Sequence, residues 1–517
     1  MLTPRPYQTR ILDQLRRWKR VSNLSDPGTG KTFETGLYLL DQGEHPVILA
    51  APDTVIPDWC EMFRDTWPDH NWVDCRSGKK GVKELLKLLG GTTPAGRHIF
   101  ATTSDLLRSK LEIRGEAHSR VDWATINRLR GLALVVDECH LVTRPESTRG
   151  RVLRALAGRC DVVAALTGTP IGRDKHARAW GHTQLVAPWI LDHYGVRDYR
   201  GFKIRYCECE DTSGRVVPGG PIVRWVDEER VKRELLEPQA AYTAYVSKAE
   251  ALPDLPPQIF YRRYTSLRGE PKRIYDQMEK ELRVVLADTV LKTPGVAVAM
   301  ARCLEIASGW VEGRVVHLGK MELLRDCLEE FGDEPKSLWC TRTRTLLSAA
   351  LVAAGRSPEE AMRQVAGVPA VGTTNTEERE EGELGTSVDA SSPEYRQVIR
   401  DAWRAGVGIL HGATSSAGRE RILADWKEGR IRTCVLHPNV GGAGLNLQHV
   451  ALSMYVEQCP GSIQRTQSLA RHHRSGQTRP VVTVDLLVEG TIEGRVLKAH
   501  EGEREGEVEL MEYFRGE

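Results

Sequence analysis

Short apolar runs that end in small, polar or charged residues recur along the chain, four before residue 171 and four after residue 335. Stretches with the periodicity of amphipathic helices separate them. Strand, polar loop and helix in repeated succession predict an α/β fold with parallel sheets, whose loops at the carboxyl ends of strands hold ligands. The runs are residues 45–52 (HPVILAAP), 97–104 (RHIFATTS), 132–140 (LALVVDECH), 161–170 (DVVAALTGTP), 336–343 (KSLWCTRT), 407–415 (VGILHGATS), 432–438 (RTCVLHP) and 480–490 (PVVTVDLLVEG).

The pattern occurs twice, so we expect two parallel-sheet lobes, residues 1–190 and residues 321–500. Between them, residues 191–320 mix turn-rich and Pro-rich segments with helical ones, which predicts an insertion and a helical connector. Within the connector, residues 273–291 (RIYDQMEKELRVVLADTVL) have the pattern of an amphipathic helix. Residues 501–517 form a C-terminal tail.

A polar interruption falls inside the second predicted lobe. Residues 367–393 are acidic and almost without large apolar side chains, so we expect a disordered loop that cannot bury enough surface to become ordered. A helix start is predicted just before it, with Ser357 as the N-cap, Pro358 in the first turn and Glu360 closing a capping box.

The overall composition excludes little. Lys and Arg number 72 against 70 Asp and Glu, a net charge of +2, so any surface that binds phosphate groups must be local. No run of about 18 apolar residues could span a membrane, and the N-terminus lacks the apolar core of a signal peptide. We therefore expect an intracellular protein, cytoplasmic or, in a eukaryotic host, nuclear. Eleven cysteines without a CxxC pair predict reduced thiols.

A glycine-rich string, residues 25–32 (SDPGTGKT), fits most of the phosphate-loop pattern. Gly28 and Gly30 let the backbone approach a polyphosphate, while Lys31 is expected on the β- and γ-phosphates and Thr32 on Mg²⁺. ATP and Mg²⁺ are thus the predicted cofactors, with the alternative that the string is a simple turn before a helix. The predicted contacts are Asp26, Pro27, Gly28, Thr29, Gly30, Lys31 and Thr32.

The apolar run at residues 132–140 ends in two carboxylates, Asp137 and Glu138. We expect Asp137 to bind the Mg²⁺ shell and Glu138 to orient and deprotonate an attacking water, because hydrolysis needs a base within hydrogen-bond reach of the nucleophile. A strand that merely ends in an acidic turn is the alternative. Together with the phosphate loop, the pair predicts a nucleoside triphosphatase.

Two strings near the end of the chain carry further candidates. In residues 467–477 (QSLARHHRSGQ), Arg471 and Arg474 lie three apart, so we expect them on one helical face, with Gln467 one turn before Arg471. These arginines are candidates for a contact with the γ-phosphate, where a supplied arginine is worth about 10³–10⁵ in rate. The alternative is that the string is a basic tail. Residues 441–448 (GGAGLNLQ) form a glycine-rich loop whose amides can donate to phosphate oxygens, or an ordinary tight turn.

These ordered motifs resemble helicase superfamily 2 and, more narrowly, the Swi/Snf-type DNA translocases. The resemblance covers most of the chain and includes residues 5–8 (RPYQ), 137–140 (DECH), 166–170 (LTGTP) and 252–257 (LPDLPP). It implies two RecA-like lobes, with Gln8 on the adenine, Gln467 on the nucleotide, Arg474 as an arginine finger and Arg471 beside it. It also implies residues that couple nucleotide state to nucleic acid, namely His140, Thr167, Gly168, Thr169, Gly442, Gly444 and Asn446.

The chain departs from the family pattern at several points. Ser25 stands where the phosphate loop commonly has a glycine, and Cys139 replaces the usual alanine of the box. The paired arginines often found before residues 248–257 are missing, and the acidic interruption has no counterpart.

A motor that walks along nucleic acid favours backbone contacts, because these fix position without reading sequence. The resemblance places Pro52 and Trp59 around a DNA-facing loop. The ends of apolar runs supply further candidates for phosphate contacts, which are Thr102, Thr103, Ser104, Thr414 and Ser415.

The motifs together predict an ATP-dependent, DNA-stimulated motor that translocates on duplex or branched DNA and remodels DNA or its protein complexes. Alternate closing and reopening of the two lobes around ATP would drive the movement. A strand-separating helicase, or a motor subunit of a replication, repair or nuclease system, is the alternative with the same chemistry. A non-catalytic scaffold is a minor alternative, because it gives no role to Lys31, Asp137, Glu138 and Arg474.

Overall fold

The structure, a computed structural model, describes residues 3–43, 45–67, 69–76, 79–92, 94, 96–113, 120–169, 175–210, 215–220, 222–288, 294–369, 388–441, 445–459 and 461–502. The chain divides into two compact units, of which the first runs from Met1 to Pro253 and the second from Asp254 to Arg504. The predicted connector, residues 191–320, is therefore shared between the two units. The predicted disordered loop falls largely on residues 370–387, which lie outside the described part.

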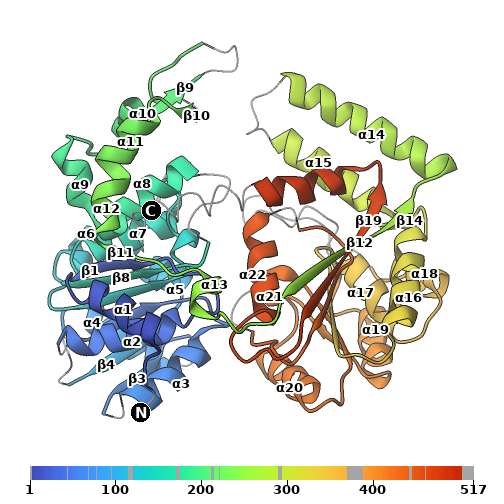
Figure 1. Cartoon of the computed structure of the whole chain (residues 1–517), viewed down its shortest axis with the longest axis horizontal. Helices are drawn as coiled ribbons and strands as arrows, with labels where there is room; N and C mark the ends of the chain where they lie inside the picture. Colours follow the sequence, from blue (N-terminus) through green and yellow to red (C-terminus); the bar gives the residue numbers. More distant parts are fainter. Residues whose placement is uncertain are drawn as a thin grey trace. The chain divides into compact units, whose positions relative to one another are not determined.

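The first unit is built on a seven-stranded sheet in the order β11-β1-β8-β7-β2-β4-β3 (Figure 1). Every pairing in it is parallel. The carboxyl ends of the strands consequently lie along one edge, where loops can converge on a ligand. The strands are β1 (Arg20–Asn23), β2 (Val47–Ala50), β3 (Asn71–Asp74), β4 (His98–Thr102), β7 (Ala133–Asp137), β8 (Val162–Leu166) and β11 (Thr243–Ala244).

Helices flank this sheet. One buried core joins it to α4, α5, α7 and α8, while α1, α2 and α3 pack in succession against one another. The bounds are α1 (Pro6–Leu15), α2 (Lys31–Asp41), α3 (Ile56–Thr66), α4 (Lys79–Leu89), α5 (Ser104–Leu111), α6 (Trp123–Ile126), η1 (Cys139–Leu141), α7 (Thr148–Ala157) and α8 (Lys175–Val186), with a short hairpin of β5 (Glu112–Ile113) and β6 (Arg120–Val121).

The remainder of the first unit has an apolar cluster of its own, centred on Phe202 and Tyr206. It consists of α9 (Pro188–His193), α10 (Tyr199–Tyr206), a two-stranded sheet of β9 (Cys207–Cys209) and β10 (Ile222–Trp225), then α11 (Glu228–Val231), η2 (Lys232–Leu236), α12 (Glu237–Ala240) and α13 (Lys248–Ala251).

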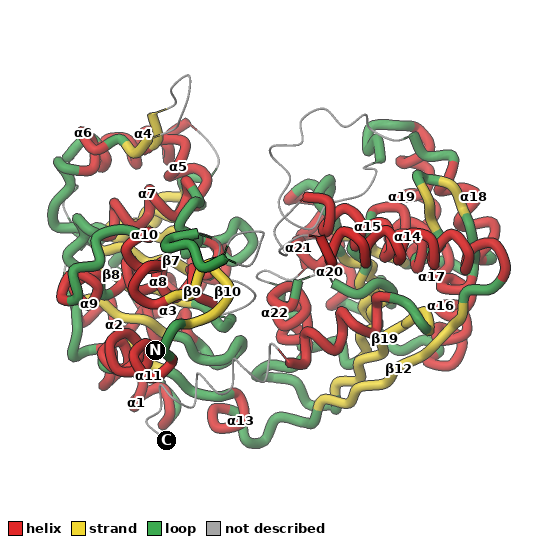
Figure 2. Tube along the Cα trace, turned by 90° about the horizontal axis from the view of Figure 1, so that it is seen from above, coloured by secondary structure: helices red, strands yellow, loops and turns green. Residues whose placement is uncertain are grey.

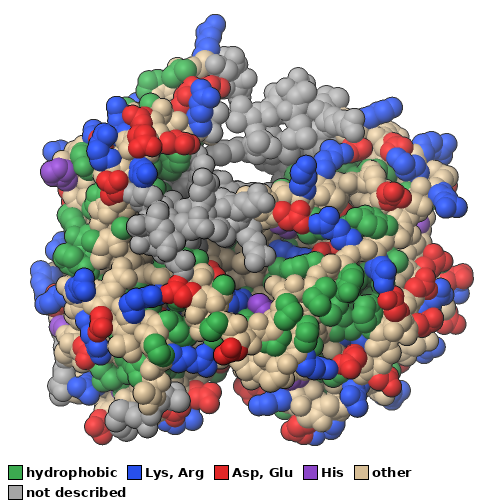
Figure 3. Space-filling view, in the orientation of Figure 1, with side chains coloured by type: hydrophobic (Ala, Val, Ile, Leu, Met, Phe, Trp, Pro, Cys, Tyr) green, Lys and Arg blue, Asp and Glu red, His purple; other side chains and the backbone are tan. Residues whose placement is uncertain are grey.

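The second unit has a six-stranded sheet in the order β12-β19-β18-β15-β17-β16, again parallel throughout. Figure 2 shows β12 and β19 side by side, paired over nine residues from Gln258 and Val481 onward. As the outermost strand, β12 exposes the apolar and aromatic side chains of Ile259, Phe260, Tyr261 and Tyr264. Hydrophobic side chains also gather on the surface of this unit that Figure 3 shows. The strands are β12 (Gln258–Ser266), β15 (Lys336–Trp339), β16 (Val407–Leu410), β17 (Thr433–Leu436), β18 (Leu452–Tyr455) and β19 (Val481–Glu489).

Helices cover the second sheet as well. The predicted amphipathic helix is present as α14, and the predicted capping box is present at α18, where the Ser357 hydroxyl accepts from the Glu360 N–H. The bounds are α14 (Gly269–Asp288), α15 (Pro294–Ala307), α16 (Gly319–Phe331), α17 (Thr343–Ala353), α18 (Pro358–Ala366), α19 (Pro393–Arg404), α20 (Ser416–Lys427), α21 (Pro438–Gly441) and α22 (Ser462–His472), with a hairpin of β13 (Trp310–Val311) and β14 (Arg314–Val315).

The expected fold class is confirmed, because two parallel sheets with flanking helices follow one another along the chain. Each of the eight apolar runs contains a strand, β2, β4, β7, β8, β15, β16, β17 and β19. All eleven cysteines are free, as predicted. Within the described residues, no helix is both long enough and apolar enough to cross a membrane.

Candidate nucleotide-binding site

The phosphate loop connects β1 to α2 at the carboxyl edge of the first sheet. Gly28 and Gly30 adopt φ angles of 88° and 100°, a left-handed conformation that favours glycine, and α2 begins directly afterwards at Lys31. The Lys31 ammonium folds back on the loop and donates to the carbonyl oxygens of Ser25 at 2.7 Å and Asp26 at 3.2 Å. The first turn of α2 thus offers backbone N–H groups and a cation at one place, as polyphosphate binding requires.

The serine that replaces the first glycine of the loop has a structural role. The buried Ser25 hydroxyl accepts from the Val246 N–H at 3.1 Å, and the Asp26 carboxylate accepts from the Lys248 N–H at 2.7 Å. Both partners follow β11, which is the edge strand beside β1. Ser25 and Asp26 therefore hold the phosphate loop to the segment that follows β11 at this side of the sheet.

Helix α1 lies against the phosphate loop through Gln8, the predicted adenine contact. The Gln8 amide nitrogen is so close to Gly30 that a Cβ there would meet it at 2.6 Å. The Gln8 side-chain carbonyl accepts from the Arg5 backbone N–H at 3.0 Å, and the Tyr7 hydroxyl donates to the Thr29 backbone carbonyl. The string RPYQ thus forms the start of α1 next to the loop, although no motif had singled out Tyr7.

A buried carboxylate beneath the loop was also missed. Glu34 has no exposed surface and accepts from the Asn23 side-chain amide at 2.6 Å. Burial raises the pKa of Glu34 to about 7, while hydrogen bonds from Asn23 and Gln8 and the charge of Lys31 oppose the rise. This network joins the end of β1 to α1 and α2.

The two carboxylates of the DECH string lie at the end of β7. Asp137 is held on both oxygens, because Oδ1 accepts from the Glu138 N–H at 2.9 Å and Oδ2 accepts from the Trp59 indole at 2.8 Å. Burial and the neighbouring Glu138 raise the pKa of Asp137 to about 6, against the lowering effects of Trp59 and Lys31. Burial lowers the pKa of Lys31, and the carboxylates of Glu138 and Asp137 oppose that shift.

Glu138 connects the DECH string to the LTGTP string. It adopts φ +50°, an uncommon conformation for a residue other than glycine, and its Oε2 accepts from the Thr167 hydroxyl at 3.2 Å. The same hydroxyl lies 2.9 Å from His140 Nδ1 and accepts from the Thr169 N–H at 3.1 Å. The predicted coupling residues His140, Thr167 and Thr169 therefore form one network with the predicted base.

The LTGTP string also touches the phosphate loop. A Cβ on Gly168 would lie 2.5 Å from Pro27 Cγ, so only glycine allows this approach. The structure of the first unit thus brings together the phosphate loop, the carboxylates, the coupling residues and Gln8.

These residues fit ATP and Mg²⁺ on chemical grounds. The Thr32 hydroxyl and the Asp137 carboxylate are hard oxygen donors, and Mg²⁺ is typically held by one or two such groups together with phosphates and water. In the part of the chain that the structure describes, no cluster of three or more His, Cys, Asp or Glu side chains could hold a metal.

The arginine string of the second unit is arranged differently from its prediction. Helix α22 ends at His472, so Arg471 and Arg474 do not share a helical face, which corrects that expectation. Gln467 and Arg471 lie on α22, one turn apart. The chain turns after His473, and the Arg474 guanidinium donates to the Leu445 carbonyl at 3.4 Å. This contact places Arg474 against Leu445, within the glycine-rich GGAGLNLQ string.

The two histidines between these arginines are structural. His472 is fully buried, with Nε2 2.8 Å from the Ser337 hydroxyl on β15, whereas His473 Nε2 lies 2.8 Å from the Pro256 carbonyl. The RHHR string is therefore not a continuous exposed basic run, because His472 is buried in the second unit.

The glycine-rich string 441–448 is only partly described. The predicted coupling residues Gly442 and Gly444 lie outside the described residues. Asn446 is exposed, and its side-chain carbonyl accepts from the Gln448 N–H at 3.4 Å.

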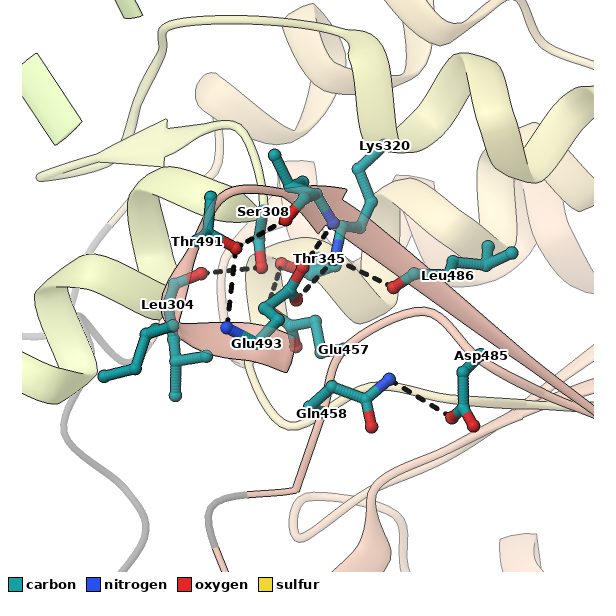
Figure 4. A network of polar contacts seen from close by, with 12 residues as sticks. Leu304, Ser308, Lys320, Thr345, Glu457, Gln458, Asp485, Leu486, Thr491 and Glu493 are labelled. Atoms are coloured by element: carbon teal, nitrogen blue, oxygen red, sulfur yellow. Dashed lines mark hydrogen bonds and ion pairs between the residues drawn. The ribbon is translucent and has the colours of Figure 1, made fainter. Parts of the chain in front are cut away.

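The second unit contains a buried polar network that no sequence motif indicates (Figure 4). Glu457 accepts from the backbone N–H groups of Thr341 and Arg342, at 2.7 and 2.8 Å, and from the Thr345 hydroxyl at 2.9 Å. Burial opposes ionisation, yet the charge of Arg342 keeps the pKa of Glu457 below its usual value. Beside it, Lys320 and Glu493 form a fully buried ion pair. This network fixes the loop between β18 and α22.

A second buried ion pair anchors α22 itself. Arg465 Nη1 lies 2.7 Å from Asp485 Oδ1 on β19, and the guanidinium stacks over the Tyr455 ring at 3.5 Å. No sequence motif indicated Arg465, because an arginine whose carboxylate partner is distant in the sequence forms no local pattern.

The candidates for DNA contacts have unequal exposure. Thr102, the last residue of β4, has no exposed surface, so its side chain cannot reach a phosphate group; this corrects its prediction. Thr103 and Ser415 cap α5 and α20, and the Thr414 hydroxyl bonds within its own loop. Together with the partly exposed Pro52 and Ser104, they stay predictions.

Several known proteins are similar to this chain in sequence. Residues 386–476 match the helicase conserved C-terminal domain. The chain is 21% identical to Protein CHROMATIN REMODELING 19 of Arabidopsis thaliana, over 91% of this chain and 63% of that protein. It is 20% identical to the ISWI chromatin-remodeling complex ATPase ISW1 of Saccharomyces cerevisiae, over 96% of this chain and 39% of that protein. The chain thus spans less than two thirds of the length of these relatives.

A relative of similar size comes from a virus. Putative protein p41 of Acyrthosiphon pisum secondary endosymbiont phage 1 is 22% identical, over 97% of this chain and 96% of that protein. Among solved structures, the Sulfolobus solfataricus SWI2/SNF2 ATPase core in complex with dsDNA is 19% identical with a TM-score of 0.38, covering 96% of this chain and 90% of that one. The sequence matches support the resemblance of this chain to Snf2-type, helicase-like proteins of superfamily 2.

Proposed function

We propose that the protein is an ATP-dependent, DNA-stimulated motor that translocates on double-stranded DNA. One observation carries the proposal: Lys31, Asp137, Glu138 and Thr167 meet at one edge of the first sheet. A small-molecule kinase would also use a phosphate loop, but it would give no role to the network of His140, Thr167 and Thr169. The two relatives that carry chromatin remodelling in their names support the choice of duplex DNA as partner.

In the proposed reaction, the backbone N–H groups at the start of α2 and the Lys31 ammonium bind the β- and γ-phosphates. Thr32 and Asp137 would hold Mg²⁺, which would neutralise charge on the phosphate oxygens. Glu138 orients a water molecule and accepts its proton. Gln8 contacts the adenine.

Arg474 of the second unit is proposed to stabilise the charge that develops on the γ-phosphate, with Arg471 and Gln467 as further contacts. Such an arginine acts only on the transition state, so its loss affects turnover and spares ATP binding.

The coupling between hydrolysis and DNA is proposed to pass through the Thr167 hydroxyl. It bonds to Glu138 at the nucleotide and lies beside His140 and Thr169. A change at the γ-phosphate that moves Glu138 therefore alters the hydrogen bonds of the LTGTP string. Such a network can bias two states of the chain, as a motor requires.

Displacement of a triplex-forming strand tests translocation directly, because a motor that walks on duplex DNA strips the third strand without separating the two below it. We expect wild-type protein to displace the third strand with ATP, and Lys31→Ala protein to leave it bound. A forked duplex is assayed in parallel. Strong unwinding of the fork without triplex displacement would contradict translocation and favour the strand-separating helicase.

A further inference from the structure

Helix α3 reaches into the nucleotide site through one side chain. Trp59 has no exposed surface, and its indole N–H donates to Asp137 Oδ2 at 2.8 Å. The other oxygen of the same carboxylate accepts from the Glu138 N–H at 2.9 Å. Two donors from different elements, α3 and the end of β7, therefore hold the two oxygens of the predicted Mg²⁺ ligand.

The indole ring itself has little freedom to move. It stacks on Phe63, with ring centroids 5.6 Å apart, and Phe63 meets Trp67 edge-on at 5.0 Å. The Trp67 indole donates to the Gly36 carbonyl of α2 at 3.2 Å. A Cβ on Gly36 would lie 2.5 Å from the Met62 sulfur, so α3 is seated closely on the helix that follows the phosphate loop.

We propose that Trp59 is a positioning residue of the nucleotide site, whose indole N–H orients the Asp137 carboxylate toward Mg²⁺. The inference rests on the proposed function and deepens it. A carboxylate rotates easily about its last torsion, and two fixed donors set its plane. Each oxygen keeps acceptor capacity for a further partner, because an ionised carboxylate offers about four lone-pair sites.

The type of residue fits this role. An indole nitrogen only donates, so it cannot compete with Asp137 for the cation, and its ring excludes water from the back of the carboxylate. Partners that orient a metal ligand in this manner typically change metal affinity or activity about 10–100-fold when they are removed.

Trp59→Phe tests the proposal, since phenylalanine fits within the volume of tryptophan and removes the N–H. A fluorescent ADP analogue is titrated into wild-type and variant protein, first with Mg²⁺ and then with EDTA. We expect the affinity in EDTA to be unchanged, and the gain in affinity on adding Mg²⁺ to fall about 10-fold.

Trp67→Phe is the matched control, because it removes one indole N–H from the same aromatic stack without touching Asp137. Equal Mg²⁺ gains in wild type and Trp59→Phe would overturn the proposal, as would equal losses in the two variants, which would indicate general loosening of α3. If Trp59→Phe fails to fold, Trp59→His takes its place; its ring N–H is expected to keep part of the Mg²⁺ gain, and a complete loss would contradict the proposal. A wild-type protein that binds no nucleotide would instead contradict the proposed function.

Discussion

Ser25 shows how a single departure from a motif can have a physical reason. Its buried hydroxyl accepts from the Val246 N–H at 3.1 Å. A glycine, the commoner residue at this position, could not form this hydrogen bond between the phosphate loop and the segment after β11. Removing this acceptor leaves a backbone donor without its partner, at a cost of about 1–3 kcal/mol.

Ser25→Gly, which would restore the commoner glycine, is therefore expected to lower the free energy of unfolding by about 1–3 kcal/mol. Denaturant unfolding measures the change. Ser109→Ala is the control, because it removes an exposed hydroxyl and should leave stability nearly unchanged. Ser109→Gly would not serve, since Ser109 lies within helix α5 and a glycine there lowers helix stability. An unfolding free energy for Ser25→Gly equal to or above that of wild type would contradict the role given to Ser25.

At the same scale, the sequence revealed residues within contiguous motifs and missed those whose partners are distant. Lys31, Asp137 and Glu138 were found because glycines and apolar runs mark their positions. Trp59 was named only beside a predicted DNA-facing loop, and Glu34 was not named, since their partners Asp137 and Asn23 lie on other elements. Thr102 failed as a DNA contact because position after an apolar run does not reveal burial.

At the scale of elements, apolar runs predicted eight of the thirteen strands in the two main sheets of the described residues, and the strands that escaped include β1 and β18. β1 reads RVSN and β18 reads LSMY, and each includes polar residues that are buried in the sheet. Buried polar residues break the apolar pattern on which strand prediction depends. The end of α22 was also missed, because spacing alone cannot show that a helix stops between Arg471 and Arg474.

The anchoring of α22 has a consequence for acid stability. Burial lowers the pKa of His472 to about 4, so the folded chain keeps this imidazole neutral, whereas an unfolded chain binds the proton near pH 6.5. Between these values the unfolded state holds more protons, and stability is lost as the pH falls from about 6.5 toward 4. His411, whose pKa burial and His437 lower to about 4, acts in the same direction.

We therefore expect the free energy of unfolding to fall by an amount on the order of 3 kcal/mol per buried histidine over that window. Denaturant unfolding at several pH values measures it. His472→Gln should show a shallower dependence on pH, while the exposed His193→Gln should match wild type. Identical slopes in His472→Gln and wild type would contradict this account of α22.

At the scale of the whole molecule, the chain consists of two parallel-sheet units that carry different parts of the predicted chemistry. The first holds the phosphate loop, the carboxylates and the coupling threonines, and the second holds Arg471, Arg474 and Asn446. The two main parallel sheets could be predicted because the strand and helix pattern repeats. The division of residues 191–320 between the units could not, since it depends on contacts between segments far apart in sequence.

The rate of phosphate release tests the proposed function most directly, measured without nucleic acid and with single-stranded, duplex and forked DNA. We expect DNA to stimulate wild-type protein, and Lys31→Ala to remove hydrolysis. Arg474→Ala should lose about 10³-fold or more in turnover while ATP still binds. Arg479→Ala, an exposed arginine paired with Glu334, is the matched control and should remain active. The motor would be contradicted, and the scaffold favoured, if DNA left phosphate release unchanged and Lys31→Ala were indistinguishable from wild type. The arginine finger would be contradicted if Arg474→Ala bound DNA more weakly but kept full turnover at saturating DNA.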